Sequence, residues 1–338
     1  MKNASDRVIT DPVRLSADAA RDLGYRALLS LGLAEEHAHT VVAHLVDAML
    51  CGYPFAGLPR ILAIADTPEL QDPRTPVSIS FETPVSAVVD GGNNPGYVAV
   101  HRGAQIAIEK ARASGVAIVG VNNTWHSGRN AYYLEKIARA GFIGIHVASG
   151  GGMVVPSGAT RPALGTNPLA IAVPSDPHPI IFDMGTGATM WGEVVLKAFL
   201  GEDFAEDVGL DAMGRPTRSA VEISKGGVLP FGGHKGYGLS FMIQALGLLA
   251  GSKRRHGEVF DFGYLFVVFT PDLLMPAGQF KQQLAELVTK IKAMPRQPGV
   301  DEIRIPSERA FRERELRTVE GVLLERRVYA ALLAMGSA

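Results

Sequence analysis

The first eighty residues repeat apolar positions at the spacing of a helix. The stretch SADAARDLGYRALLSLG begins with Ser16, a residue type that caps helices, and ends at Gly32. The stretch AEEHAHTVVAHLVDAMLCG repeats the pattern. We therefore expect residues 1–80 to form a small helical unit.

From Val77 onward the pattern changes to short runs that are rich in β-branched residues and typical of strands. Seven such runs are VSISFE, VSAVVDG, VAIVGV, FIGIHVAS, LAIAVPS, PIIFDM and YLFVVFT, with helical patterns between several of them. We expect residues 81–300 to form an α/β domain. Residues 201–228 are Gly-rich, charged and weakly periodic, which predicts a long excursion from that domain. Residues 301–338 are again helical in pattern, and we expect them to pack with the N-terminal unit.

The most apolar segment is LSFMIQALGLLAG, from Leu239 to Gly251. It is shorter than the roughly 20 residues that a membrane span requires. We therefore expect a core helix there and no association with a membrane.

Composition narrows the class of protein. A hydrophobic content of 47% over 338 residues is enough for two cores, and a formal net charge of −1 gives no field that would hold nucleic acid. Cys51 is the only cysteine, which excludes an intrachain disulfide. Because the polar start MKNASDRVITDP lacks the apolar stretch of a signal peptide, we expect a cytoplasmic protein.

Several familiar signatures are missing from the sequence. It has no G-x-G-x-x-G after a predicted strand, no G-x-x-x-x-G-K-[ST], no H-E-x-x-H and no pair of C-x-x-C motifs. His37, His39 and His44 lie close together in a polar helical stretch without a carboxylate at ligand spacing, so we expect a solvated face and no metal site.

The stretch VNNTWHSGRNAYYLEK places His126 in a turn between a predicted strand and a predicted helix that ends at Gly141. Ligands gather at the carboxyl ends of strands in open α/β folds, because loops there vary on a rigid scaffold. A histidine whose hydrogen bonds are satisfied in an ordinary turn is the other interpretation.

Three further loops present polar groups after Gly-rich or apolar runs. Gly150 to Pro168 is typical either of an anion-binding loop, with Thr166 and Asn167 as neutral donors, or of a surface loop. Asp183 at a strand end can orient a histidine or cap the helix ATMWGEVVLKAF. His234 and Lys235 in LPFGGHKGYGLS indicate an anion site at a helix start, or a capped helix with a solvated lysine.

The segments NNTWHSGRNAYY, ALGTNPLAIAVP, FDMGTGAT and GGHKGYGLS, in this order and spacing, resemble the type 2 malate/L-lactate dehydrogenase family. That family also holds ureidoglycolate, sulfolactate and diketogulonate enzymes and the Δ1-piperideine-2-carboxylate/Δ1-pyrroline-2-carboxylate reductases. The resemblance covers nearly the whole chain, including GVDEIRIPSERAFRERE near its end. It implies an α/β fold in which the cofactor domain is not a Rossmann fold but a predominantly antiparallel seven-stranded sheet wrapped by helices. This accounts for the missing glycine fingerprint.

The resemblance also implies roles for individual residues. His126 is treated as an acid/base in some members, Asp183 is similar to a charge-relay acid, and Thr166 is similar to a substrate contact. The residues expected at an NADH or NADPH cofactor are His126, Ser127, Gly128, Arg129, Asn130, His234, Lys235, Ser307, Glu308 and Arg309. Members are usually homodimers with the active site between subunits.

One segment departs from the family. Its N-terminal pattern is Gly, two residues, Ser-His-Gly, and an Arg three residues later. Here CGYPFAGLPRI retains the glycines and Arg60, but Phe55 and Ala56 replace the Ser-His pair. In relatives that histidine is commonly assigned as the proton donor to the substrate.

The loss of this acid favours a different substrate. Reduction of a 2-keto acid needs a proton for the developing alkoxide, so removing the acid slows it severely. A cyclic imine is basic enough to be protonated before hydride arrives, and the enzyme then has only to hold its carboxylate. Arg60 suits the carboxylate and Phe55 suits the ring. We therefore expect a reductase of Δ1-pyrroline-2-carboxylate or Δ1-piperideine-2-carboxylate, forming L-proline or L-pipecolate.

Two other functions compete with this one. The first is a 2-hydroxy acid dehydrogenase of the malate, lactate or ureidoglycolate kind, in which His126 or a water takes over the proton. The second is a non-catalytic dinucleotide binder, against which the retention of Arg60, Thr166, Asp183 and Lys235 argues. The choice between NADH and NADPH depends on a positive group near the ribose, for which Lys253, Arg254 and Arg309 are candidates.

Overall fold

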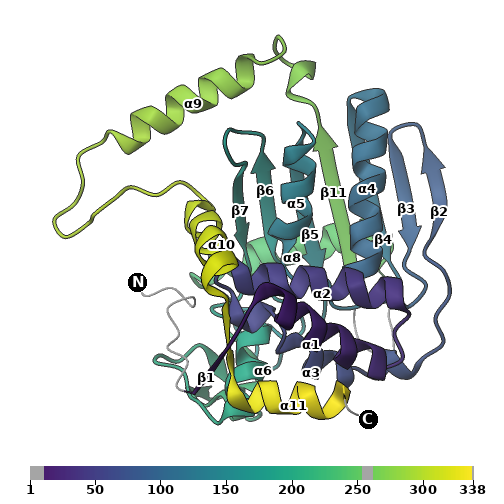
Figure 1. Ribbon diagram of the computed structural model, residues 1–338, viewed down its shortest axis with the longest axis vertical. Coiled ribbons are helices and arrows are strands. Elements are labelled where there is room, and N and C mark those ends of the chain that lie inside the picture. Colours follow the sequence, from purple (N-terminus) through teal and green to yellow (C-terminus); the bar gives the residue numbers. More distant parts are fainter. Residues whose placement is uncertain (1–10, 253–261, 337–338) are drawn as a thin grey trace.

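The computed structural model describes residues 11–252 and 262–336, and its largest element is a seven-stranded sheet (Figure 1). The seven runs that the pattern predicted as strands are its seven strands. They are β2 (Ser78–Thr83), β3 (Ser86–Asp90), β4 (Val116–Asn122), β5 (Ile143–Ser149), β6 (Leu169–Val173), β7 (Ile180–Met184) and β11 (Gly263–Phe269).

The sheet is predominantly antiparallel, as expected. The strand order is β2-β3-β4-β11-β5-β6-β7, and only the β3–β4 pair is parallel. The last run in the sequence therefore lies in the middle of the sheet. This order brings the ends of β4, β5 and β11 together, although β11 follows β5 by more than a hundred residues.

Helices cover the two faces of the sheet unequally. On one face, α4 (Gly96–Ser114) and α5 (Asn130–Arg139) pack over buried side chains such as Val119 and Phe266. On the other face, α8 (His234–Leu249) contacts β5 and β11 through a smaller cluster that includes Val147 and Leu265. Successive residues of a strand face opposite sides, so Leu265 and Phe266 belong to different cores.

The expectation that Leu239 to Gly251 forms a core helix is wrong. The segment is helical within α8, but Phe241 is 57% exposed and Leu249 is 70% exposed. A helix that is apolar all round predicts burial, and here the chain itself covers only one side of it. No helix among the described residues is long and apolar enough to cross a membrane.

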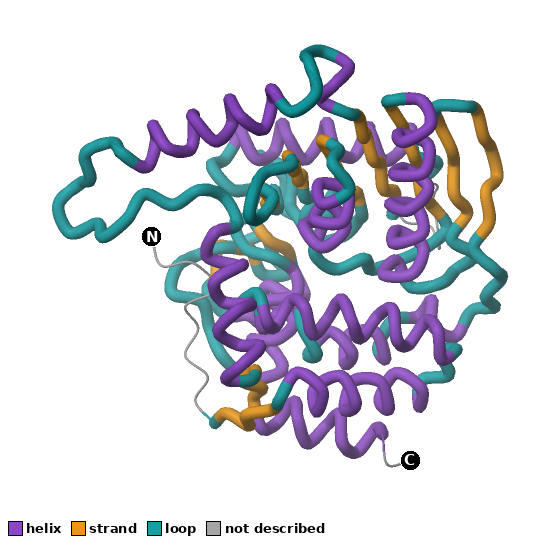
Figure 2. The backbone as a smooth tube through the Cα atoms, turned by 45° about the horizontal axis from the view of Figure 1, so that its top comes forward, coloured by secondary structure: helices purple, strands orange, loops and turns teal. Residues whose placement is uncertain are grey.

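The first and last elements of the described chain lie side by side below the sheet (Figures 1 and 2). Strand β1 (Pro12–Leu15) pairs with β12 (Val322–Glu325), two strands that the helical pattern did not predict. Helices α1 (Ala17–Ser30), α2 (Glu35–Leu50) and α11 (Arg326–Gly336) share one core with them.

Local sequence explains the ends of the first two helices. The Ser16 hydroxyl accepts the amide of Ala19 at 3.1 Å, as an N-cap does. Gly32 and Gly52 follow the helix ends with positive φ angles, where a side chain would be strained. After α2, η2 (Pro54–Ala56) leads into α3 (Arg60–Ala65), which places Phe55, Ala56 and Arg60.

Residues 201–228 form a small subdomain beside α6 (Trp191–Leu200). It contains α7 (Ala220–Lys225) and a three-stranded sheet of β8 (Gly209–Leu210), β9 (Pro216–Thr217) and β10 (Gly227–Val228). Its core joins Ile223 and Phe204 to Val154 and Leu164 of the preceding long loop. The excursion therefore supports the Gly150 to Pro168 loop from outside.

The segment after β11 extends away from the body of the molecule. Helix α9 (Gln279–Lys292) has no buried residue, and Figures 1 and 2 show it reaching outward before the chain returns to α10 (Glu308–Glu320). The return is anchored by Phe311, which belongs to the core under the sheet.

Candidate functional site

A cavity of about 380 Å³ lies where the helical unit, the sheet, the Gly150 to Pro168 loop and the start of α6 meet. It brings together most of the candidate residues. Those lining it are Phe55, Ala56, Arg60, His126, Ser127, Gly128, Arg129, Asn130, Thr166, Asn167, Asp183 and Ser307. Five segments far apart in sequence thus converge on one site.

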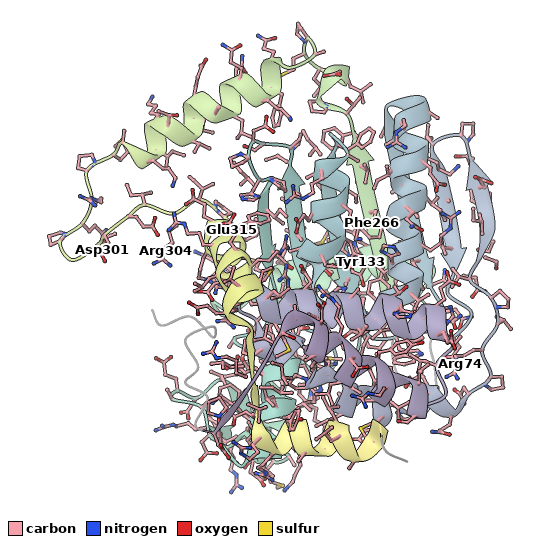
Figure 3. All side chains as sticks on the ribbon, in the orientation of Figure 1. Arg74, Tyr133, Phe266, Asp301, Arg304 and Glu315 are labelled. Atoms are coloured by element: carbon pink, nitrogen blue, oxygen red, sulfur yellow. The ribbon has the colours of Figure 1, made fainter. Side chains whose placement is uncertain are left out.

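The loop after β4 is held by hydrogen bonds to its backbone. The Tyr264 hydroxyl donates to the carbonyl of Trp125 at 2.8 Å, and the Tyr133 hydroxyl donates to that of Ser127 at 2.5 Å. The Trp125 indole donates to the carbonyl of Asn93 at 3.1 Å. Tyr133 on α5 lies beside Phe266 on β11 above the helical unit in Figure 3. The buried aromatic side chains therefore fix the loop to the sheet.

His44 is a functional candidate that the sequence interpretation missed. The expectation of a solvated face is wrong for His44, which is 1% exposed and packs against Tyr97, Tyr132 and Tyr133. Its Nε2 accepts the backbone amide of Arg129 at 2.9 Å. His39 is exposed, as expected, and stacks on Tyr25.

The position of His44 also explains Gly128. A Cβ atom there would lie 2.6 Å from His44 Nε2, and Gly128 has a φ of +76°. Burial, with the positive charge of Arg129 nearby, holds the pKa of His44 well below its usual value. A neutral ring keeps Nε2 free to accept the Arg129 amide. The helical spacing of α2 shows which face carries His44, but not that the face is buried by another segment.

His126 faces the cavity as a neutral ring. Burial, with the Arg60 guanidinium nearby, lowers its pKa to about 3. Its ring contacts Phe262 edge to face, with the centroids 5.3 Å apart. At neutral pH His126 therefore carries no extra proton to give to a substrate.

Asp183 caps a helix other than the one that the sequence suggested. Its Oδ2 accepts the backbone amide of Ala131 at 2.8 Å, at the start of α5. The N-cap of α6 is Met190, whose side chain makes no capping bond, so the cap that we considered for α6 is not formed by Asp183. Burial raises the pKa of Asp183, while the Ala131 amide and Arg129 oppose that rise.

Arg60 and Phe55 share a wall of the cavity with the start of α6. A Cβ atom at Gly192 would lie 3.3 Å from the Phe55 carbonyl and 3.4 Å from Arg60 Nη1. The missing side chain of Gly192 lets these groups approach closely. Apolar side chains that sequence analysis did not single out complete the wall, and they are Met153, Phe182, Met190, Trp191 and Phe262.

Hydrogen bonds hold two further candidates, Thr166 and Ser307, in place. The Thr166 carbonyl accepts the amide of Thr186 at 2.7 Å and its hydroxyl at 3.0 Å. Ser307 has a φ of +70°, and its hydroxyl donates to the carbonyl of Ile181 at 2.6 Å. Both residues therefore sit on rigid parts of the cavity rim.

Four candidates do not line the cavity. His234 and Lys235 are exposed at the start of α8. Glu308 pairs with Lys292 at 2.6 Å, and the Arg309 guanidinium lies 4.8 Å from the centre of the Tyr53 ring. Lys253 and Arg254 lie outside the described residues. Within 11–252 and 262–336, no group of three or more His, Cys, Asp or Glu residues could hold a metal ion.

Arg129 is held on the helical side of the cavity. Although burial alone would lower its pKa, the Cys51 thiol and the Asp47 carboxylate raise it. Its guanidinium also lies 4.8 Å from the centre of the Tyr53 ring, on which Arg309 packs at the same distance. Arg129 therefore stays charged at the edge of the site.

Comparison with known proteins identifies the family. The family model described as malate/L-lactate dehydrogenase matches residues 15–333. The chain is 33% identical to the malate/(S)-sulfolactate dehydrogenase of Methanothermus fervidus, over 94% of this chain and 96% of that protein. It is 35% identical to the Δ1-pyrroline-2-carboxylate/Δ1-piperideine-2-carboxylate reductase of Pseudomonas putida, over 69% of this chain and 70% of that protein.

A solved structure shows the same architecture. The Δ1-piperideine-2-carboxylate reductase from Pseudomonas syringae pvar. tomato superposes with a TM-score of 0.80 at 28% identity, over 96% of this chain and 99% of that one. These relatives are dehydrogenases and reductases, a class that implies a nicotinamide nucleotide cofactor. The chain belongs to the malate/L-lactate dehydrogenase family and is an oxidoreductase.

Proposed function

We propose that the protein reduces a small cyclic 2-imino acid, Δ1-pyrroline-2-carboxylate or Δ1-piperideine-2-carboxylate, to the L-amino acid. The observation that carries the proposal is the wall in which Phe55 and Ala56 stand beside Arg60, facing a His126 that is neutral. Such a wall suits a ring that bears a carboxylate and whose imine nitrogen is already protonated. The named activity of the Pseudomonas putida relative supports it.

The cavity fits a nicotinamide cofactor. It offers apolar and aromatic side chains for a flat ring, and it contains a buried amide, that of Asn130, whose polar atoms have no partner in the described structure. When bound, the cofactor supplies the hydride. We propose that His126, Ser127, Gly128, Arg129, Asn130 and Ser307 border it, and that Lys235 and Arg309 reach its outer part.

The residues of the cavity then have distinct tasks. The Arg60 guanidinium binds the substrate carboxylate through paired hydrogen bonds. Phe55 and its apolar neighbours hold the ring and exclude water. The Asp183 carboxylate is the negative group in the lining, and it favours the cationic iminium over the neutral imine. Because the proton is already on the substrate nitrogen, no side chain has to supply it during hydride transfer.

A second candidate function is that of a 2-hydroxy acid dehydrogenase. The observation that favours it is the neutral His126 in the cavity beside Arg60, because a neutral imidazole can accept the proton of a substrate hydroxyl. A pKa of about 3 makes this ring a weak base at neutral pH. The cyclic imine therefore remains the better match.

We also propose that the protein is a homodimer. The exposed apolar side of α8 continues onto the open part of the sheet, where Ile118, Ile171 and Phe182 are all exposed. The ladder places these three in one row across the sheet, on the side that α8 partly covers. A continuous apolar face of this kind is typical of an interface, and a second copy of the chain matches its lack of charge.

Installing the missing pair tests the imine reductase. Replacing Phe55→Ser together with Ala56→His should raise the kcat/KM for pyruvate or oxaloacetate by up to about 10²-fold, since it supplies a general acid. The control is Phe55→Ser alone, which opens the wall without adding an acid. Steady-state rates of the purified variants measure both. If the double variant is no better than the control on keto acids, a missing acid does not limit that reaction.

A further inference from the structure

Asn130 is the first residue of α5 and is 1% exposed. It contributes to the wall of the cavity. Among the described residues, neither its Nδ2 nor its Oδ1 has a hydrogen-bond partner, although both atoms are buried. Buried polar side chains are normally paired, because leaving both ends of an amide unpaired costs free energy in the folded state.

A second asparagine in the same cavity shows the usual arrangement. Asn167 is also 1% exposed, and its Nδ2 donates to the Ser240 carbonyl at 3.0 Å and to Gln244 Oε1 at 2.9 Å. Its Oδ1 accepts the amide of Gly150 at 3.1 Å. The cavity therefore satisfies one amide fully with protein groups and leaves the other without a partner.

The position of Asn130 is fixed by its own backbone. The amide of the next residue, Ala131, donates to Asp183, and the amide of Asn130 itself interacts with the same carboxylate. This contact ties the start of α5 to β7. The unpaired side chain thus belongs to a rigid part of the wall, as a preorganised recognition group does.

The chemistry of the amide selects its ligand. Asn130 offers a donor and an acceptor side by side, so a group with one acceptor and one donor in the same plane satisfies both. A substrate carboxylate only accepts hydrogen bonds, which would leave Oδ1 unpaired, and the Arg60 guanidinium is available for it. A carboxamide matches both atoms.

We propose that Asn130 binds the carboxamide of the cofactor's nicotinamide ring through a pair of amide–amide hydrogen bonds. The inference rests on the nicotinamide cofactor of the proposed function. Its consequence is orientation, because a carboxamide held at both ends fixes which face of the ring is turned toward the substrate.

Binding of dinucleotide analogues tests the proposal without turnover. Quenching of tryptophan fluorescence, to which Trp191 in the cavity wall contributes, gives a Kd for each ligand. The ligands are NAD+, NADP+, their 3-acetylpyridine analogues, which keep the carbonyl but lack the N–H donors, and ADP-ribose, which lacks the ring. The proteins are the native chain, Asn130→Ala and Asn130→Asp.

We expect the native chain to bind the acetylpyridine analogue about tenfold more weakly than the nicotinamide form. Asn130→Ala should weaken binding of the nicotinamide form by at least that factor and should no longer distinguish the two rings. Asn130→Asp should weaken binding of both rings, because a carboxylate cannot donate to their carbonyl, but should keep the preference, because it still accepts the carboxamide N–H. The Kd for ADP-ribose should stay within about twofold in all three proteins. Thermal unfolding without ligand should show Asn130→Ala to be no less stable than the native chain, because the amide makes no bond to lose.

Three results would overturn the proposal. They are equal weakening of ADP-ribose, which indicates a structural role, an unchanged preference for nicotinamide in Asn130→Ala, and native protein that binds neither dinucleotide. A native protein that shows the expected Kd pattern but reduces no cyclic imine would contradict the proposed substrate and leave the role of Asn130 supported.

Discussion

Individual side chains on the helical unit determine the geometry of the loop after β4, which we propose borders the cofactor. His44 comes from α2, yet it accepts the amide of Arg129 and fills the space that Gly128 leaves open. The loop residues from Trp125 to Asn130 thus depend on a histidine some eighty positions earlier in the chain. We regard His44 as a positioning residue that acts through the loop.

Variants of His44 separate positioning from packing. His44→Phe keeps a ring but leaves the buried Arg129 amide without an acceptor, a loss of about 1–3 kcal/mol. We expect its Arg129 amide to exchange hydrogen faster and the KM for the cofactor to rise several-fold, with a smaller change in kcat. His44→Gln retains an acceptor and should restore much of both. Equal behaviour of the two variants in hydrogen exchange and in KM would reduce His44 to a packing residue.

Sequence analysis named several residues that the structure brings into one cavity. Positions at strand ends and in Gly-rich loops indicated His126, Thr166 and Asp183, and the family resemblance indicated Arg60. It could not identify the unpaired state of Asn130. Whether a buried amide finds a partner depends on the side chains around it in space, and sequence spacing does not show these.

At the level of elements, the strands were predictable and their arrangement was not. Each of the seven runs has the composition and length of a strand, which local pattern reveals. The insertion of β11 between β4 and β5 depends on long-range pairing. In the C-terminal stretch, β12 interrupts a helical pattern because β1 offers it a partner. Local pattern also could not show that the rest of the chain covers only one side of α8.

Helix α8 provides the prediction at this scale. Replacing Phe241→Glu and Leu249→Glu places charges in the proposed interface, and we expect the mass in solution to fall from twice 36.0 kDa to 36.0 kDa. Light scattering after size exclusion measures it. Met213→Glu, in the turn between β8 and β9, is the control because Met213 is an equally exposed apolar residue away from α8. A native protein of 36.0 kDa would contradict the dimer.

For the whole molecule, the cavity lies where separate cores meet. The helical unit contributes Phe55 and Arg60, the sheet contributes Asp183, the start of α6 contributes Trp191, and the return from α9 contributes Ser307. No single segment of the chain forms the site. Family resemblance could nevertheless assign candidate residues before the fold was known. The apolar wall became visible only when these segments were assembled.

The most direct test of the account is the substrate profile of the native protein. We expect kcat/KM for Δ1-pyrroline-2-carboxylate or Δ1-piperideine-2-carboxylate, with NADH or NADPH, to exceed that for pyruvate and oxaloacetate. It should fall as the pH rises past the pKa of the iminium, because the reactive cation is then lost. Between pH 5 and this point it should be flat, since His126, with a pKa of about 3, stays neutral throughout. Faster reduction of pyruvate or oxaloacetate than of either cyclic imine would contradict the account and would favour the 2-hydroxy acid dehydrogenase.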